Sequence, residues 1–88
     1  MWIRSQDKEF LIKVDNVNLG LDVNTNELNR LFTFVGGAVT SLTLGTYNSK
    51  ERAIEVLNEI QTWIERYEAA KVSGKLFIAF ITYEMPEE

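Results

Sequence analysis

The side chains of this chain that could do chemistry are carboxylates, hydroxyls and amines, because the sequence contains no histidine and no cysteine. Zinc sites of the usual His and Cys type, cysteine nucleophiles and histidine-based triads are therefore excluded. The most regular spacing belongs to Glu51, Glu55 and Glu59, which would form one acidic stripe on a helix. Such like charges repel, which suggests a basic partner or a cation. We favour a solvated helix face, relieved by Arg52 and by the helix dipole at Glu51.

Other groups of polar residues do not form a recognisable site. Asp7, Glu9 and Asp15 are close in sequence, but they lack the ligand count and the glycine of a calcium loop. We expect them to be turn residues, with one turn at Asp7-Lys8. Gly36-Gly37 lacks the lysine and the following helix of a phosphate loop. We therefore predict no catalytic, cofactor-binding or metal-ligating residues, no cofactor, and no enzymatic activity.

The charge distribution bears on partners and location. The net charge is −4, and the nine basic residues are scattered, so nucleic-acid binding is not expected. The residues after Met1 lack the apolar region of a signal peptide. The longest apolar run, Leu76 to Ile81, is far too short to span a membrane. We predict a soluble cytoplasmic protein without a membrane partner.

Apolar and turn residues alternate in a way that predicts six strands and one helix. With 88 residues there is room for a single domain, residues 1–88. The fold class predicted is α+β: a mostly antiparallel curved sheet of about five or six strands, with one long helix on one face and a C-terminal strand. A final β-α-β unit is expected, with a right-handed crossover. The predicted strands are Trp2–Ser5, Phe10–Val14, Val17–Val23, Asn29–Val35, Ala38–Tyr47 and Lys75–Tyr83.

The predicted helix runs from Ser49 to about Val72. Asn48 or Ser49 can cap its first turn, and with Asn48 as cap Glu51 takes the capping-box position. Ser73-Gly74 ends it, since glycine readily adopts the left-handed conformation that follows a helix. Apolar residues recur at spacings of three and four and predict one buried stripe. The stripe comprises Ala53, Val56, Leu57, Ile60, Trp63, Ile64 and Tyr67.

Two predicted strands, Asn29–Val35 and Lys75–Tyr83, carry large apolar side chains on both faces. One helix covers only one face of a sheet, so the second face must be closed by curling of the sheet or by another subunit. Both solutions receive equal weight. The candidate interface residues for a homodimer are Phe32, Phe34, Phe77 and Ile81.

Three segments carry a resemblance to a known family. They are Leu44-Gly45-Thr46-Tyr47 with the following helix start, Met1 to Asp7, and Tyr83-Glu84-Met85-Pro86. Together they resemble a family of small proteins of prophages and mobile elements in Gram-positive bacteria. The resemblance implies a bacterial or phage cytoplasmic setting and no activity. The function we predict is a non-enzymatic accessory role through an unidentified protein partner or self-association. The alternative is an acidic regulator that binds a host protein or a nucleic-acid-binding protein, and a small enzyme ranks third.

Overall fold

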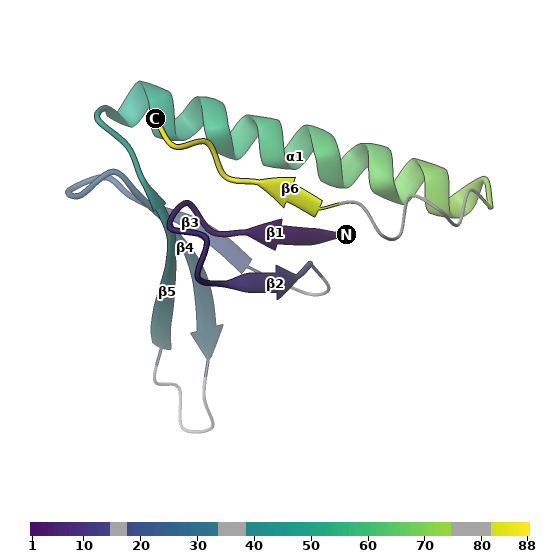
Figure 1. Ribbon diagram of the computed structural model, residues 1–88, viewed down its shortest axis with the longest axis horizontal. Helices are drawn as coiled ribbons and strands as arrows, with labels where there is room; N and C mark the ends of the chain where they lie inside the picture. Colours follow the sequence, from purple (N-terminus) through teal and green to yellow (C-terminus); the bar gives the residue numbers. More distant parts are fainter. Residues whose placement is uncertain (15–17, 34–38, 75–81) are drawn as a thin grey trace.

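The computed structural model describes residues 1–14, 18–33, 39–74 and 82–88, and it has an α+β architecture (Figure 1). Phe34, Phe77 and Ile81 of the predicted interface lie outside the described residues, as does most of the predicted strand Lys75–Tyr83. The elements in chain order are β1 (Trp2–Arg4), β2 (Leu11–Lys13), β3 (Asn18–Asp22), β4 (Glu27–Thr33), β5 (Val39–Thr46), α1 (Lys50–Val72) and β6 (Thr82–Glu84).

The described strands form two three-stranded sheets, with the orders β2-β1-β6 and β3-β4-β5. The prediction of one curved sheet of five or six strands is therefore wrong. The expected β-α-β unit is also wrong in its pairing, because β6 lies beside β1 and not beside β5. Ile3 pairs with Tyr83 in parallel and with Ile12 in antiparallel register. Short strands from opposite ends of the sequence thus pair within one three-stranded sheet.

A tight loop joins β3 to β4 and sets their register. The main-chain oxygen of Asp22 accepts from the N–H of Asn26 at 2.8 Å, and Asn26 has a φ of 57°. Asparagine tolerates this left-handed conformation better than most residues do. Because the loop closes on Asp22 and Glu27, β4 begins two residues before the predicted Asn29.

The connection from β1 to β2 confirms the turn predicted at Asp7 and Lys8. The carboxylate of Asp7 accepts from the Ser5 hydroxyl at 2.6 Å and from the Glu9 N–H at 2.9 Å. These hydrogen bonds, the one from Ser5 foremost, lower the pKa of Asp7. Lys8 follows with a φ of 70°. Asp7 and Glu9 therefore serve a turn.

Helix α1 confirms the predicted boundaries, but not the capping box. Ser49 is the N-cap, and its hydroxyl accepts from the Arg52 N–H at 3.1 Å. With the cap at Ser49, the residue three positions on is Arg52, so Glu51 cannot close a capping box with Asn48. Ser73 caps the other end, and Gly74 follows with a φ of 78°. The predicted stop at Ser73-Gly74 is therefore correct.

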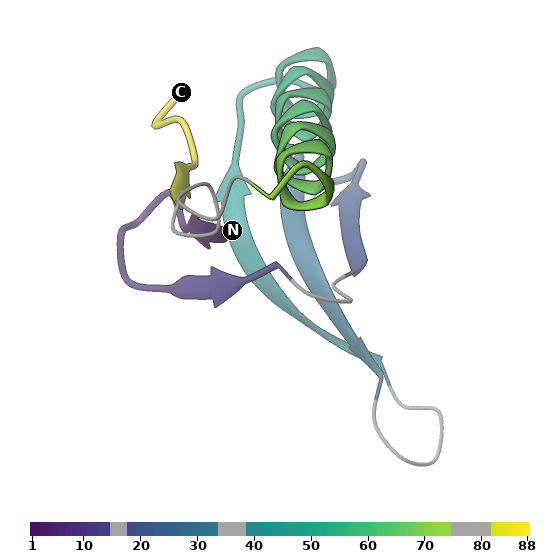
Figure 2. The same ribbon diagram turned by 90° about the vertical axis from the view of Figure 1, so that its right-hand side faces the viewer.

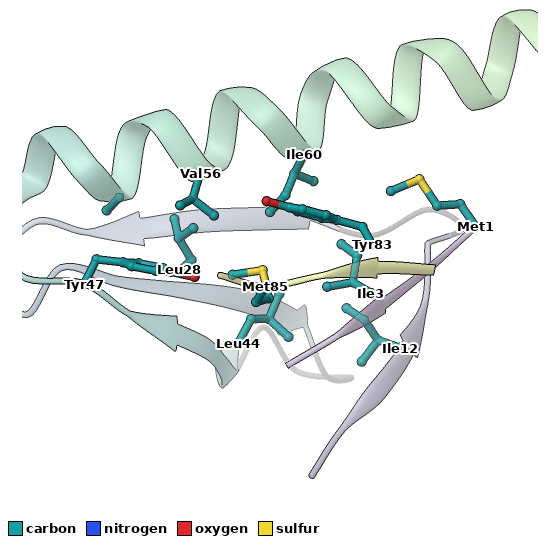
Figure 3. Packing of buried hydrophobic residues seen from close by; sticks show 11 residues of the cluster. Met1, Ile3, Ile12, Leu28, Leu44, Tyr47, Val56, Ile60, Tyr83 and Met85 are labelled. Atoms are coloured by element: carbon teal, nitrogen blue, oxygen red, sulfur yellow. The ribbon is translucent and has the colours of Figure 1, made fainter. Parts of the chain in front are cut away.

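One core joins the helix to both sheets (Figure 3). Val56 and Ile60 point from α1 toward the strands, over Leu28 of β4 and Tyr83 of β6. Burial of a large aliphatic side chain stabilises the fold by about 1.5–3 kcal/mol, so this cluster is its main support. The buried apolar members are Met1, Ile3, Ile12, Leu28, Leu44, Tyr47, Ala53, Val56, Ile60, Tyr83 and Met85.

Candidate functional site

An open apolar depression of about 300 Å³ lies between α1 and β3. We call it the α1–β3 groove. Figure 2 shows α1 end-on above the β3-β4-β5 sheet, with β3 as its outer strand. The groove is lined by Leu19, Leu57, Ile60, Gln61, Ile64 and Glu65.

Helical spacing and strand alternation explain how these side chains meet. Residues three and four apart share a helix face, which aligns Leu57, Gln61 and Ile64 along one flank of α1. On β3, Leu19 faces the helix. Ile60 is buried, whereas Leu57, Ile64 and Leu19 are only partly covered. Among the described strands the sheet ends at β3, so no further described strand lies beneath the outer part of the apolar stripe.

The polar groups of the groove lie on its helix side. The side-chain amide of Gln61 donates to the carboxylate of Glu65 at 3.2 Å. Both side chains are exposed. The groove therefore offers aliphatic surface with one acidic group at its margin.

The opposite flank of α1 is closed by β6 and the residues after it. The rings of Trp63 and Tyr83 are stacked, with centroids 6.3 Å apart and planes 17° from parallel. The hydroxyl of Tyr47 donates to the main-chain oxygen of Pro86 at 2.9 Å. Arg52 donates to the main-chain oxygen of Glu88 at 2.9 Å and lies 5.9 Å from the Tyr47 ring centroid. Aromatic and polar contacts thus fill this side.

The two buried tyrosines are the only titratable groups here with strongly raised pKa values among the described residues. Burial raises the pKa of Tyr47 to about 12. Burial also raises the pKa of Tyr83, and the nearby charge of Glu59 raises it further. The Tyr83 hydroxyl is buried and makes no hydrogen bond of good geometry among the described residues, although the Glu59 carboxylate is near enough to act on it as an acceptor. A phenol in this state holds its proton tightly, which makes it a poor general base at neutral pH.

The acidic stripe predicted from the sequence is exposed on α1. Glu51, Glu55 and Glu59 all lie on the solvent-facing part of the helix. The Arg52 guanidinium contacts the Glu55 carboxylate at 3.1 Å, which is the relief predicted from the sequence. Within the described residues, no group of three or more acidic side chains could hold a metal ion. A role of the stripe in function stays a hypothesis.

The structure leaves the predicted homodimer interface untested. The backbone of Phe32 lies in β4 opposite Thr40, but its side chain lies outside the description, as do Phe34, Phe77 and Ile81. The sequence analysis missed the α1–β3 groove. A signal for it was present, because Leu57 and Ile64 lie at one margin of a wide apolar stripe.

Comparison with known proteins adds no relative: no family model, no curated protein and no solved structure matches this chain. Among the described residues, no helix is long and apolar enough to cross a membrane.

Proposed function

We propose that this protein is a non-enzymatic accessory protein of phage or prophage origin that acts by contacting another protein or a second copy of itself. The α1–β3 groove is the contact surface. The observation that supports this choice is the partial exposure of Leu19, Leu57 and Ile64 around one depression. These three apolar side chains lie together at one depression, and such clustering distinguishes interaction sites from singly exposed apolar residues.

The composition of the groove favours a protein over a small molecule. Small-ligand sites of this volume are enclosed and carry several convergent polar groups that orient the ligand. Here the lining is aliphatic apart from Gln61 and Glu65, which already bond to each other. Apolar side chains of a partner chain fit such a surface. The proposed setting is the cytoplasm, without a nucleic-acid partner.

The exposed carboxylates support a second candidate, an acidic regulator of a basic host protein or of a nucleic-acid-binding protein. Glu51, Glu55 and Glu59 present negative charge on a part of α1 away from the groove. Binding through them would weaken steeply with added salt, because exposed charges are screened. Binding through the groove would depend little on salt.

The experiment compares a groove variant with a matched surface variant. Gln61→Arg places a bulky cation at the margin of the groove, while Thr62→Arg adds the same charge at the next residue, outside the groove lining. Light scattering measures self-association, and affinity capture from a lysate of the source cells measures other partners. We expect Gln61→Arg to weaken the association by about tenfold and Thr62→Arg to leave it unchanged.

Equal binding by the wild type and both variants would contradict the proposed use of the groove. Loss of binding in Glu55→Gln and Glu59→Gln, together with strong salt dependence, would favour the acidic regulator.

A further inference from the structure

The outer edge of β3 offers main-chain hydrogen-bonding groups next to the α1–β3 groove. The main-chain oxygen of Asp22 accepts a hydrogen bond from the Asn26 N–H within the β3–β4 hairpin, so it points toward β4. Hydrogen bonding alternates along an antiparallel ladder, so Asn18, Gly20 and Asp22 bond toward β4. The N–H and C=O groups of Leu19 and Leu21 therefore point outward. Figure 2 shows no other described element beyond β3 on this side.

An edge strand of this kind is a template for another strand. We propose that β3 pairs antiparallel with β3 of a second copy, about a two-fold axis at Gly20. The inference names the partner for the proposed function and rests on it.

The sequence of β3 is complementary to itself in this register. Leu19 lies opposite Leu21 of the second copy, and each such pair exchanges two main-chain hydrogen bonds through the outward groups. Asn18 lies opposite Asp22 of the second copy, so a side-chain amide meets a carboxylate and no like charges face each other. A shift of the register by two residues in either direction reduces the hydrogen-bonded pairs within β3 from two to one, which is Leu19 with Leu19 or Leu21 with Leu21.

Both faces of the joined sheet gain apolar contact. On the helix side, Leu19 and Leu21 are partly buried beside the groove and would be covered by their counterparts. On the other side, Leu31 is 38% exposed and lies against Gly20, where an added Cβ would be 3.1 Å from its Cδ1 atom. Since two glycines meet at the axis, the two Leu31 side chains can close over them.

The helices also favour this arrangement. A two-fold axis perpendicular to the sheet keeps both copies of α1 on the same face and makes them antiparallel. The flanks carrying Leu57 and Ile64 then face each other across the joined strands, and each groove receives apolar side chains from the second copy.

Amide hydrogen exchange tests the hydrogen bonds directly. At roughly 1 mM chain, we expect the Leu19 and Leu21 amides to exchange at least about tenfold more slowly than at roughly 10 μM. The Gly20 amide is the internal control, because its bond to β4 protects it at both concentrations. A dimer in which Leu19 and Leu21 exchange as fast as in the monomer would overturn the proposal.

A charge swap tests the register. Asn18→Asp places two pairs of like charges opposite each other and should raise the dimer dissociation constant about tenfold. Adding Asp22→Asn restores an amide opposite each carboxylate and should bring the constant back toward the wild-type value. Asparagine at this position keeps the oxygen that accepts from the Asn24 N–H. Sedimentation equilibrium measures the constants, and thermal unfolding of each variant checks the fold.

Three outcomes would overturn the pairing: a monomeric wild type at roughly 1 mM, a dimer indifferent to Asn18→Asp, or a double variant no tighter than the single one. A monomer whose capture of another protein is still abolished by Gln61→Arg would leave the proposed function standing without the dimer. Protection of Leu19 and Leu21 only on addition of a different protein would assign β3 to an external strand.

Discussion

The two edges of the β3-β4-β5 sheet differ in their hydrogen bonding. At the β5 edge, the Gln6 N–H donates to the Leu44 oxygen at 2.7 Å, and the Thr46 N–H donates to the side-chain oxygen of Gln6 at 2.8 Å. At the β3 edge, Leu19 and Leu21 point their main-chain groups away from the sheet. Edges that are left open invite pairing, and proteins normally cover them. The covered edge stabilises the fold, and the open edge is the one that we propose for recognition.

The two flanks of α1 repeat this difference. Toward β6, Tyr83 stacks on Trp63 and is almost fully buried. Toward β3, Leu57 and Ile64 are only partly covered and line a groove. The open edge and the open flank are adjacent, because β3 is the last described strand of its sheet and leaves this flank of α1 partly uncovered. Substitutions on the closed side should therefore cost stability, and those on the open side should cost association.

The largest contrast is expected within the apolar stripe of the helix. Ile60 is 1% exposed, so Ile60→Ala should cost about 2–5 kcal/mol through lost burial and the cavity left behind. Leu57 is only partly buried, and Leu57→Ala should cost about 1 kcal/mol. Urea unfolding at low micromolar concentration measures both. Equal losses would mean that the groove is closed in solution.

Gln6 and Gln61 provide the next test, because the same residue type lies at the covered β5 edge and at the open groove. The side-chain amide of Gln6 donates to the oxygens of Thr46, Pro86 and Glu87, at 3.0, 3.2 and 2.9 Å. Gln6→Ala leaves these groups and the Thr46 N–H without their partner and should cost about 2 kcal/mol. Gln61→Ala removes one exposed bond and should change stability by about 0.5 kcal/mol or less.

Thermal unfolding of Gln6→Ala and Gln61→Ala ranks the two sites. A Gln6→Ala variant as stable as the wild type would show that water replaces its bonds and that the β5 edge is not sealed by this side chain.

The sequence was sufficient for the local features of this fold. The helix boundaries followed from the apolar period and from Gly74, and the strands β3 and β4 followed from the alternation of apolar and turn residues. The two-sheet arrangement could not be predicted from the sequence. Strands β1 and β6 pair although almost the whole chain separates them, and the sequence of neither strand specifies its partner. The choice of Ser49 over Asn48 as the N-cap could not be predicted either, since both residues suit that position.

The α1–β3 groove could not be predicted from the sequence for a related reason. The periodicity of α1 identifies which residues are apolar, but not how far the sheet extends beneath them. Leu57 and Ile64 belong to the same stripe as Ile60, and they are partly open because β3 is the outermost of the described strands in its sheet.

On the closed flank of α1, one substitution is expected to raise the stability of the fold instead of lowering it. Among the described residues the buried Tyr83 hydroxyl makes no hydrogen bond of good geometry, and the negative charge of Glu59 lies nearby. Tyr83→Phe therefore removes a poorly compensated polar group while keeping the ring stacked on Trp63. We expect a gain of about 1 kcal/mol in the free energy of unfolding at neutral pH. Calorimetry of the variant and the wild type measures this difference, and a loss of stability would indicate that the hydroxyl has a partner in solution.

The pH dependence of stability in Tyr83→Phe tests whether the Tyr83 hydroxyl is buried, independently of how the ring packs. Burial raises the pKa of Tyr83 above its ordinary value of 10.0, so the folded chain retains the phenol proton more strongly than the unfolded chain does. The resulting contribution to stability is complete below pH 10 and declines as the pH rises above it. Tyr83→Phe should decline less steeply between about pH 10 and 12, with Tyr47 responsible for the remaining slope. Parallel alkaline curves for the wild type and the variant would place the Tyr83 hydroxyl in solvent and would remove the contrast between the two flanks of α1.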